Sequence, residues 1–221
     1  APSKGICKEL ERLIYNNNRI DFIPNPIELE DIKNQSKQEI DSSLTLPKHY
    51  ILAVGRLTHQ KGFDRLISIF SKIRNTDLSL VILGEGELRQ DLNSLIQDHD
   101  LEEKVYMPGL VDNPFPIYRK AICLALTSRY EGWPNVINES LASGCPVVSY
   151  NCNYGPSEIL DCDNGFLVEE NDEEVFVEAI STLYEEKEVR DEYVSIGLKS
   201  AEKYSIDKIA MHWLEKSGLD L

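Results

Sequence analysis

Between Tyr50 and Val168 the sequence alternates short apolar runs with segments of helical pattern. The apolar runs are Tyr50–Val54, Leu78–Leu83, Lys104–Met107, Ile122–Thr127, Pro146–Tyr150 and Gly165–Val168. Most are apolar throughout, which is typical of strands covered on both faces. Helices are expected between them at Phe63–Arg74, Glu87–Asp98, Pro116–Lys120, Asn135–Ser143 and Pro156–Leu160. The alternation predicts an α/β fold, with a doubly wound, mainly parallel, Rossmann-like sheet and helices on both faces.

The flanking segments follow a different pattern. Residues 3–15 form an amphipathic pattern in which Ser3 is placed to cap a helix. A short strand is expected at Ile20–Ile23, and the polar stretch 28–48 is interpreted as a linker with one surface helix. From Asp172 the chain is helical and rich in glutamate. The predicted division is an entry helix, strand and linker at 1–48, a core at 49–170, and C-terminal helices at 171–221.

Bulk composition excludes several classes of function. The 221 residues carry a formal net charge of −15, which argues against nucleic acid and against an anionic membrane as the partner of this segment. No run approaches the length of a membrane span. The cysteines are Cys7, Cys123, Cys145, Cys152 and Cys162. Because their number is odd and none forms a C-x-x-C pair, a disulfide frame or zinc site is not expected, and a reducing cytoplasm is the natural compartment.

The stretch Ser128–Tyr150 is the strongest candidate for a site. In the predicted fold its loop lies at the carboxyl end of a strand, where open α/β sheets bind ligands. Glu131 lies in that loop, and Glu139 follows eight positions later, about one turn into the next helix. Gly132 allows close approach of the backbone, and Asn135 is expected to be the N-cap. The alternative is a solvated Glu131 and a Glu139 that merely favours the helix dipole.

Arg56 and Lys61 follow the first core strand in the segment G-R-L-T-H-Q-K-G. Two fixed cations at a strand end could stabilise the charge that develops on a departing phosphate, a task that a metal ion can also perform. The alternative is a pair of solvated surface cations.

These segments resemble retaining glycosyltransferase family 4. The match rests on E-G-W-P-N-V-I-N-E-S-L-A-S-G-C-P-V-V, with seven residues between its two glutamates, and on V-G-R-L-T-H-Q-K-G-F-D-R-L-I, V-I-L-G-E-G-E-L, V-Y-M-P-G-L-V-D-N and Y-G-P-S-E-I-L-D-C-D-N-G-F-L-V. All five blocks fall in the family's order and cover most of the chain from about Ile20 onward. The resemblance implies the donor-binding, C-terminal half of a GT-B fold.

By this resemblance, Arg56 and Lys61 would hold the diphosphate without metal, and Glu131 would contact the transferred sugar. Whether Glu131 is a nucleophile stays open. Glu139 would bind the ribose hydroxyls. The remaining donor contacts would come from Gly55, Gly84, Leu110, Val111, Gly132, Asn135 and Val136, with the backbone at Leu110 and Val111 reading the base. The G-P-S-E helix start is either a further donor contact or an ordinary helix start.

The resemblance further implies a nucleotide sugar as substrate, UDP-linked by analogy with bacterial surface-polysaccharide enzymes, and neither cofactor nor metal. The acceptor would be bound by a first domain outside this sequence, which could also hold the enzyme at the inner membrane face. Two alternatives remain: a nucleotide-sugar epimerase of similar fold, and a non-catalytic nucleotide-binding module. An epimerase would interconvert free nucleotide sugars without an acceptor.

Overall fold

A computed structural model describes residues 1–14, 20–73, 77–161 and 163–217. The expected helix ends at Tyr15 and Arg74, and Cys162, lie outside the described residues.

Six strands form one parallel sheet in the order β3-β2-β1-β4-β5-β6. The strands are β1 His49–Val54, β2 Leu78–Leu83, β3 Val105–Gly109, β4 Cys123–Leu126, β5 Val147–Tyr150 and β6 Phe166–Val168. This is the strand order of a dinucleotide-binding sheet, in which the direction of winding reverses between β1 and β4. The predicted fold class is confirmed, and each strand lies within two residues of its expected bounds at either end.

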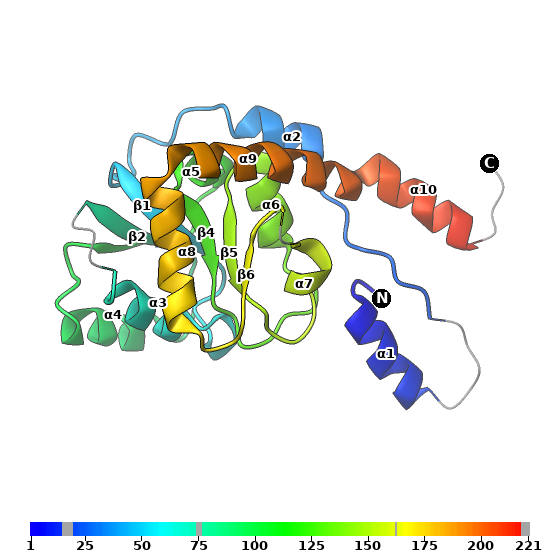
Figure 1. Cartoon of the computed structure of the whole chain (residues 1–221), viewed down its shortest axis with the longest axis horizontal. Coiled ribbons are helices and arrows are strands. Elements are labelled where there is room, and N and C mark those ends of the chain that lie inside the picture. The colour runs from blue at the N-terminus through cyan, green and yellow to red at the C-terminus, as the bar shows by residue number, and fades with distance from the viewer. Residues whose placement is uncertain (15–19, 74–76, 162, 218–221) are drawn as a thin grey trace.

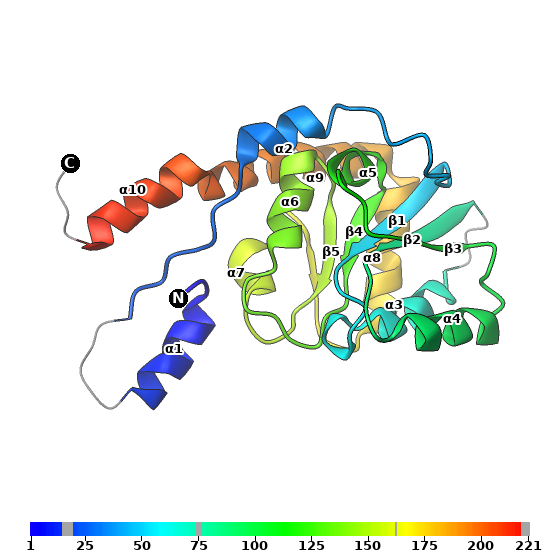
Figure 2. The ribbon, with the colours of Figure 1, turned by 180° about the vertical axis from the view of Figure 1, so that it is seen from behind.

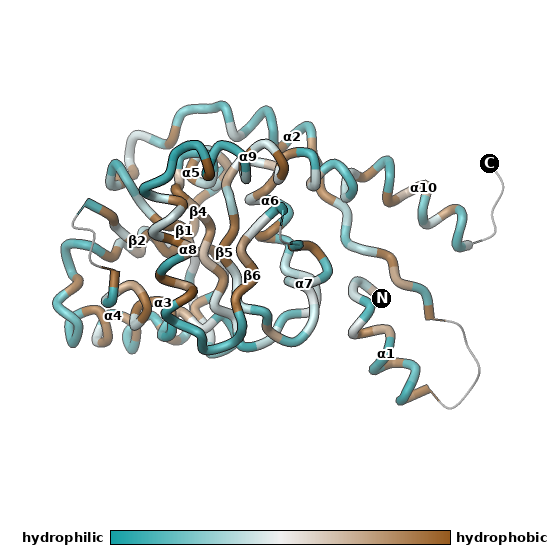
Figure 3. The backbone as a smooth tube through the Cα atoms, in the orientation of Figure 1, coloured by the Kyte–Doolittle hydropathy of each residue, from teal (hydrophilic) through white to brown (hydrophobic). Residues whose placement is uncertain are grey.

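Helices cover both faces of the sheet (Figures 1 and 2). On one face lie α3 Phe63–Phe70, α4 Arg89–Asp98 and α8 Glu173–Glu185; on the other lie α2 Leu29–Gln35, α5 Phe115–Lys120, α6 Asn135–Ser143 and α7 Pro156–Ile159. In β1, Ile51 and Ala53 join the first core while Tyr50 and Leu52 join the second. Both faces of this strand are therefore buried, as its unbroken apolar sequence predicts. Figure 3 shows the apolar strands at the centre of the molecule.

The N-terminal segment begins with α1 Lys4–Leu13. Ser3 caps it as expected, accepting a hydrogen bond from Ile6 N at 3.1 Å. The strand predicted at Ile20–Ile23 is wrong, because the described residues 20–26 join no sheet. Ile23 N instead donates to Ala1 O at 3.0 Å. A β-branched pattern makes no strand where no neighbouring strand is available to pair with it.

The linker contains the one helix that was expected, α2, but this helix is not confined to the surface. Leu29 and Ile32 are buried in the core on the α6 side of the sheet. Anchoring of α2 in the core gives the segment before β1 a defined place against the sheet.

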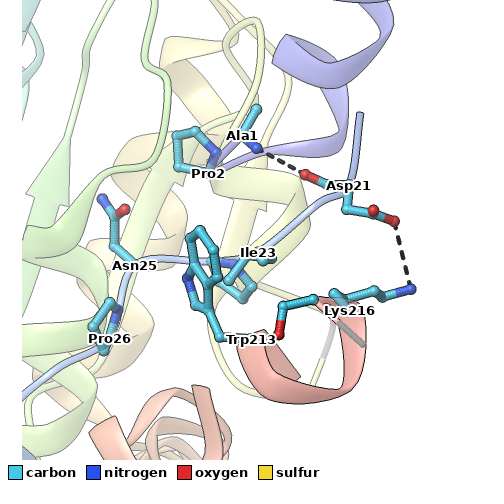
Figure 4. A pocket seen from close by; sticks show the side chains of 10 residues that line it. Ala1, Pro2, Asp21, Ile23, Asn25, Pro26, Trp213 and Lys216 are labelled. Carbon is cyan, nitrogen blue, oxygen red and sulfur yellow. Dashed lines mark hydrogen bonds and ion pairs between the residues drawn. The ribbon is translucent and has the colours of Figure 1, made fainter. Parts of the chain in front are cut away.

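The C-terminal helices are α8, α9 Lys187–Ala201, η2 Glu202–Tyr204 and α10 Ile206–Ser217. In Figure 1, α9 crosses the molecule near α6, and α10 extends past the sheet beside the N-terminal segment. Met211 and Trp213 of α10 are largely exposed. A hollow of about 430 Å³ lies between α10 and this segment, beside an ion pair between Lys216 Nζ and Asp21 Oδ1 at 3.7 Å (Figure 4). None of its lining residues belongs to the strand-end loops predicted to bind the donor.

Candidate functional site

The loops that follow β1 and β4 lie side by side at the point where the winding of the sheet reverses. Thr127 Oγ1 donates to Gly62 O at 2.9 Å, and Arg129 N donates to Gln60 O at 2.8 Å. These bonds join the segment after β1 to the segment after β4. Two stretches that are about 70 residues apart in the sequence thereby form one edge of a site.

Lys61 and Glu131 form a largely buried ion pair across this edge. Lys61 Nζ lies 2.7 Å from Glu131 Oε1, and the two side chains are 16% and 6% exposed. Ser128, which is fully buried, donates from Oγ to the same carboxylate oxygen at 2.7 Å. Glu131 is therefore not a solvated loop residue. Because Lys61 and Ser128 both bind Oε1, Oε2 is the oxygen better placed to accept a further bond.

Arg129 fixes the same two loops with its guanidinium group. Its Nη1 and Nη2 donate to Asp64 Oδ1 and Oδ2 at 2.9 and 2.6 Å, and Nη1 also donates to His59 O at 2.7 Å. These bonds from Arg129 hold the pKa of Asp64 below its usual range. A bidentate pair of this kind adds geometric precision as well as energy. The sequence analysis missed it, although Arg129 stands within the S-R-Y-E segment.

Glu139 lies in the second turn of α6, close to where the sequence analysis placed it. Tyr118 donates from its hydroxyl to Glu139 Oε2 at 3.3 Å. Burial raises the pKa of Glu139, while the Tyr118 hydroxyl and the charge of Lys61 act in the opposite direction. Tyr118 is fully buried and was not identified from the sequence, where it reads as one more core aromatic in F-P-I-Y.

The predicted N-cap role of Asn135 is wrong. Helix α6 begins at Asn135 itself, and the residue before it, Pro134, takes the cap position with no side-chain hydrogen bond. Proline at that position locks φ and displaces the polar residue by one place. The amide oxygen of Asn135 instead accepts from Asn25 Nδ2 at 3.2 Å.

An apolar pocket of about 240 Å³ opens at the ends of β1, β2 and β3. It is lined by Val54, Gly55, Arg56, Leu83, Gly84, Glu85, Gly109, Leu110, Val111 and Pro114. Five of the predicted donor contacts therefore lie together: Gly55, Arg56, Gly84, Leu110 and Val111. Gly84 has φ +141, and a Cβ there would stand 1.9 Å from Gly55 O. Only glycine permits the two loops to meet this closely.

Arg56 and Lys61 flank this region from different sides. Arg56 is exposed and lines the apolar pocket, whereas the ammonium of Lys61 contacts Glu131. A Cβ on Gly55 would lie 3.2 Å from the methylene stem of Lys61, so the lysine passes close to the start of the loop. Arg56 thus lies at the pocket, and Lys61 runs from the start of the same loop to Glu131.

The loop after β3 is attached to the linker by one side chain. Asn113 donates from Nδ2 to Gln38 Oε1 at 2.9 Å and to Gln35 O at 3.4 Å. Its Oδ1 accepts from Phe115 N at 3.2 Å, which secures the start of α5. Residues Leu110–Pro114 are therefore held both by the linker and by the following helix.

The G-P-S-E segment forms the start of α7 and connects this helix to α1. Helix α7 has four residues, and Glu158 accepts from Lys4 N at 2.7 Å and Gly5 N at 3.2 Å. A carboxylate at the first turn of α1 also suits the helix dipole. Gly155 lies against the loop that carries Glu131, since a Cβ on it would stand 3.1 Å from Gly132 O.

Val136 is half-buried in the first turn of α6, next to Asn135.

Across the described residues no three His, Cys, Asp or Glu side chains are grouped so that they could hold a metal ion. Four of the cysteines are free thiols, namely Cys7, Cys123, Cys145 and Cys152. Among the described helices, none is long and apolar enough to cross a membrane.

A sequence model of the family described as glycosyl transferases group 1 matches residues 34–200. The chain belongs to this family. The match includes all six strands and every predicted donor contact, so the site described above lies inside the family's own domain. The expected GT-B glycosyltransferase domain is confirmed.

Curated relatives of this group 1 chain are glycosyltransferases. One is N-acetylgalactosamine-N,N'-diacetylbacillosaminyl-diphospho-undecaprenol 4-alpha-N-acetylgalactosaminyltransferase of Campylobacter jejuni, 34% identical over 210 residues, which are 94% of this chain and 56% of the relative. Another is the amylovoran biosynthesis glycosyltransferase AmsD of Erwinia amylovora, 30% identical over 178 residues, 80% of this chain and 50% of the relative. The chain thus spans about half the length of these relatives.

Solved structures share the fold. The Staphylococcus aureus protein TarM, crystallised as a single-residue mutant with fondaparinux, alpha-GlcNAc-glycerol and UDP, superposes with a TM-score of 0.82 at 24% identity, over 96% of this chain and 42% of TarM. HepE of Anabaena, in complex with UDP and glucose, gives a TM-score of 0.84 at 19% identity, over 99% of this chain and 62% of HepE. At these identities the likeness concerns the fold alone.

Proposed function

We propose that this group 1 chain is the donor-binding half of a retaining glycosyltransferase of the family 4 type, and that its donor is a UDP-sugar. The product would be a bacterial surface glycan. The observation that carries the proposal is that the apolar pocket, the Lys61–Glu131 pair and Glu139 all lie at or shortly after the carboxyl ends of β1 to β4. Base, ribose, diphosphate and sugar would find complementary groups there.

The base would enter the apolar pocket, where the backbone at Leu110 and Val111 offers hydrogen-bonding groups to its edge. Glu139 would then accept from the ribose hydroxyls, as carboxylates do in dinucleotide sites.

The reaction breaks the bond between the sugar and the diphosphate, and the acceptor oxygen forms the new bond to the same carbon. UDP leaves with the electron pair, and the acceptor loses its proton. Arg56 and Lys61 would stabilise the charge that grows on the leaving diphosphate, a preorganised electrostatic effect that needs no metal ion. Glu131 would contact the sugar through Oε2, since Lys61 and Ser128 already bind Oε1.

The acceptor that we propose is a saccharide or a lipid-linked saccharide, in keeping with the diphospho-undecaprenol in the name of the Campylobacter relative. It would be held by a part of the enzyme that the present chain does not include, because the chain spans about half of such relatives. We place the reaction in the cytoplasm, with that other part as the element that would bring it to the inner membrane face; four free thiols agree with a reducing compartment.

Thermal unfolding with UDP, GDP and ADP tests this proposal. A ligand that binds only the folded state raises the melting temperature by mass action. We expect UDP to raise it most, with the increase lost in Glu139→Ala and retained in Glu178→Ala, a change at a glutamate of α8, on the other face of the sheet. Equal responses to the three nucleotides would contradict UDP as the donor nucleotide.

A second assay concerns the reaction. Incubated with UDP-sugars and saccharide or lipid-linked acceptors, the chain is expected to bind UDP without forming product, because correct positioning of the acceptor supplies roughly 7–11 kcal/mol of the barrier. Rapid transfer by this chain alone would contradict the half-enzyme interpretation. Interconversion of free UDP-sugars without acceptor would identify an epimerase instead.

A further inference from the structure

Tyr118 connects the two places where a nucleoside would be held. Its backbone N donates to Pro114 O at 3.0 Å, and Pro114 lines the apolar pocket. Its hydroxyl donates to Glu139 Oε2 at 3.3 Å. One residue of α5 thus contacts both the rim of the predicted base pocket and the predicted ribose ligand.

The tyrosine itself has little freedom to move. Tyr118 is fully buried, and its ring stacks on Phe115 with centroids 6.4 Å apart. Phe115 lines a second hollow of about 280 Å³ together with Glu139, beside α2. The ring packing therefore fixes the position of the hydroxyl beside the Glu139 carboxylate. If the hydroxyl moved away, this buried polar atom would lose its hydrogen-bond partner.

From these contacts we propose that Tyr118 is a positioning residue for ribose recognition: its hydroxyl holds the carboxylate of Glu139 in place through Oε2, so that Oε1 faces the ribose. The inference rests on the proposed function for its ribose, but the contact between Tyr118 and Glu139 can be tested without any nucleotide. Tyr118 would not touch the donor itself.

The electrostatic surroundings of Glu139 agree with this assignment. Burial raises the pKa of Glu139, and the hydrogen bond from Tyr118 is the largest of the opposing influences, ahead of the charge of Lys61. In return, burial and the neighbouring Glu139 raise the pKa of Tyr118 well above its usual value, so that its hydroxyl stays a donor. Loss of the hydroxyl should therefore make Glu139 harder to ionise.

Other charged groups near α6 have to be considered. Glu28 and Asp31 at the start of α2 line the hollow that Glu139 also lines. From α7, Glu158 is engaged with the start of α1. Helix α9 contributes the apolar side chains of Val194 and Leu198 near Gly144, at the end of α6. Tyr150 of β5 packs on Phe176 in the core on the other face of the sheet. Of the described neighbours of Glu139, Tyr118 and Lys61 favour the charged carboxylate.

Tyr118→Phe and Tyr50→Phe form a matched pair of variants. Tyr50 is also a buried tyrosine, but its hydroxyl donates to a backbone oxygen, Ile117 O of α5, at 2.8 Å rather than to a carboxylate. Each change removes one buried hydroxyl whose hydrogen bond involves α5, because Tyr118 belongs to that helix and Tyr50 bonds to its backbone. A general loosening of α5 would appear in both variants, whereas loss of positioning would appear in Tyr118→Phe alone.

The first measurement is the titration of Glu139 by carbon-13 NMR of the glutamate carboxyl groups, assigned with Glu139→Gln. We expect a higher pKa of Glu139 in Tyr118→Phe than in the native protein and no change in Tyr50→Phe. An unchanged titration in Tyr118→Phe, or an equal rise in both variants, would overturn the inference whether or not the chain binds UDP.

The second measurement is the preference for uridine diphosphate over its 2′-deoxy analogue, by calorimetry. Tyr118→Phe should reduce this preference roughly threefold to tenfold, the loss expected for one hydrogen bond, and Tyr50→Phe should leave it unchanged. A full preference in Tyr118→Phe would overturn the inference. Failure of the native protein to bind UDP would instead contradict the proposed function, with the titration still deciding the role of Tyr118.

Discussion

Lys61 Nζ lies 2.7 Å from Glu131 Oε1, so the cation predicted to bind the diphosphate is bonded to the carboxylate predicted to contact the sugar. The pair spans the two loops at the switch point of the sheet. Any anion that draws the ammonium away would leave Glu131 with Ser128 as its remaining side-chain donor among the described residues. If Lys61 binds the diphosphate, that binding would therefore change the hydrogen bonding of Glu131.

Lys61→Ala should weaken binding of UDP far more than binding of uridine, because only UDP carries the diphosphate. Hydrogen bonds to charged groups contribute about 1.5–3 kcal/mol, which corresponds to more than tenfold in affinity. Calorimetric titration with both ligands measures the difference. Lys72→Ala is the control, since Lys72 is an exposed lysine paired with Glu173 on the α3–α8 side. An equal loss for UDP and uridine would show that Lys61 does not contact phosphate.

Arg129→Lys should destabilise the protein by about 1 kcal/mol, because lysine cannot reproduce the second of the two parallel hydrogen bonds to Asp64. The effect is moderated by solvent, as the Asp64 side chain is 43% exposed. Urea unfolding gives the value. Arg65→Lys is the control: its single bond, from Nη1 to Glu170 Oε1 at 2.9 Å, should cost less to replace.

The destabilisation by Arg129→Lys should also depend on pH. Arg129 lowers the pKa of Asp64, so the stability gained from this pair is present above the usual Asp pKa of about 3.9 and is lost as the pH falls through the lowered value. The difference in the free energy of unfolding between the native protein and Arg129→Lys should therefore become smaller in acid. If the difference in the free energy of unfolding stayed constant down to the lowest pH at which both proteins fold, the ion pair with Asp64 would not be the cause of the destabilisation.

Glu139→Gln should raise the melting temperature at neutral pH while weakening UDP binding. Burial raises the pKa of Glu139, which means that the folded state disfavours its charge. Stability is then highest below the usual Glu pKa of about 4.3 and falls as the pH rises through the raised value. Glutamine keeps a partner for Tyr118 and removes that cost. The gain should vanish in acid, and Glu178→Gln on α8 should show none. A variant less stable than the native protein at pH 7 would contradict this account.

UDP affinity should be the same with EDTA as with magnesium or manganese, if Arg56 and Lys61 carry the charge that a metal would otherwise supply. Titration in both conditions checks this. A large loss in EDTA that either metal restores would mean that the diphosphate is bound through a cation.

The sequence predicts those features of the candidate site that depend on a single motif. Glu131, Glu139 and Lys61 could be placed near a strand end or a helix start because each motif indicates its own local geometry, whereas Gly55 and Gly84 followed from the family resemblance. The contact between Lys61 and Glu131 could not be identified, since it depends on how two distant loops meet. Tyr118 was hidden for a related reason, because a buried tyrosine in an apolar run indicates core packing and says nothing of its hydroxyl.

Each of the two incorrect predictions has a physical cause. Asn135 is a favoured cap residue, but Pro134 before it takes the cap position and moves the helix start. Ile20–Ile23 has the composition of a strand, yet strand formation needs a partner edge, and the edges of this sheet are β3 and β6. In both cases a residue preference was outweighed by the chain next to it or by the sheet far from it.

If the proposed base pocket is correct, Asn113 would give the linker an influence on which nucleotide is accepted. The bonds from Asn113 to Gln35 and Gln38 fasten the loop that carries Leu110 and Val111 to the linker. Sequence drift in that segment could retune donor choice while every lining residue stays the same. Enzymes of this architecture with identical pockets could then prefer different nucleotides, and grafting pocket residues alone would fail to transfer the preference.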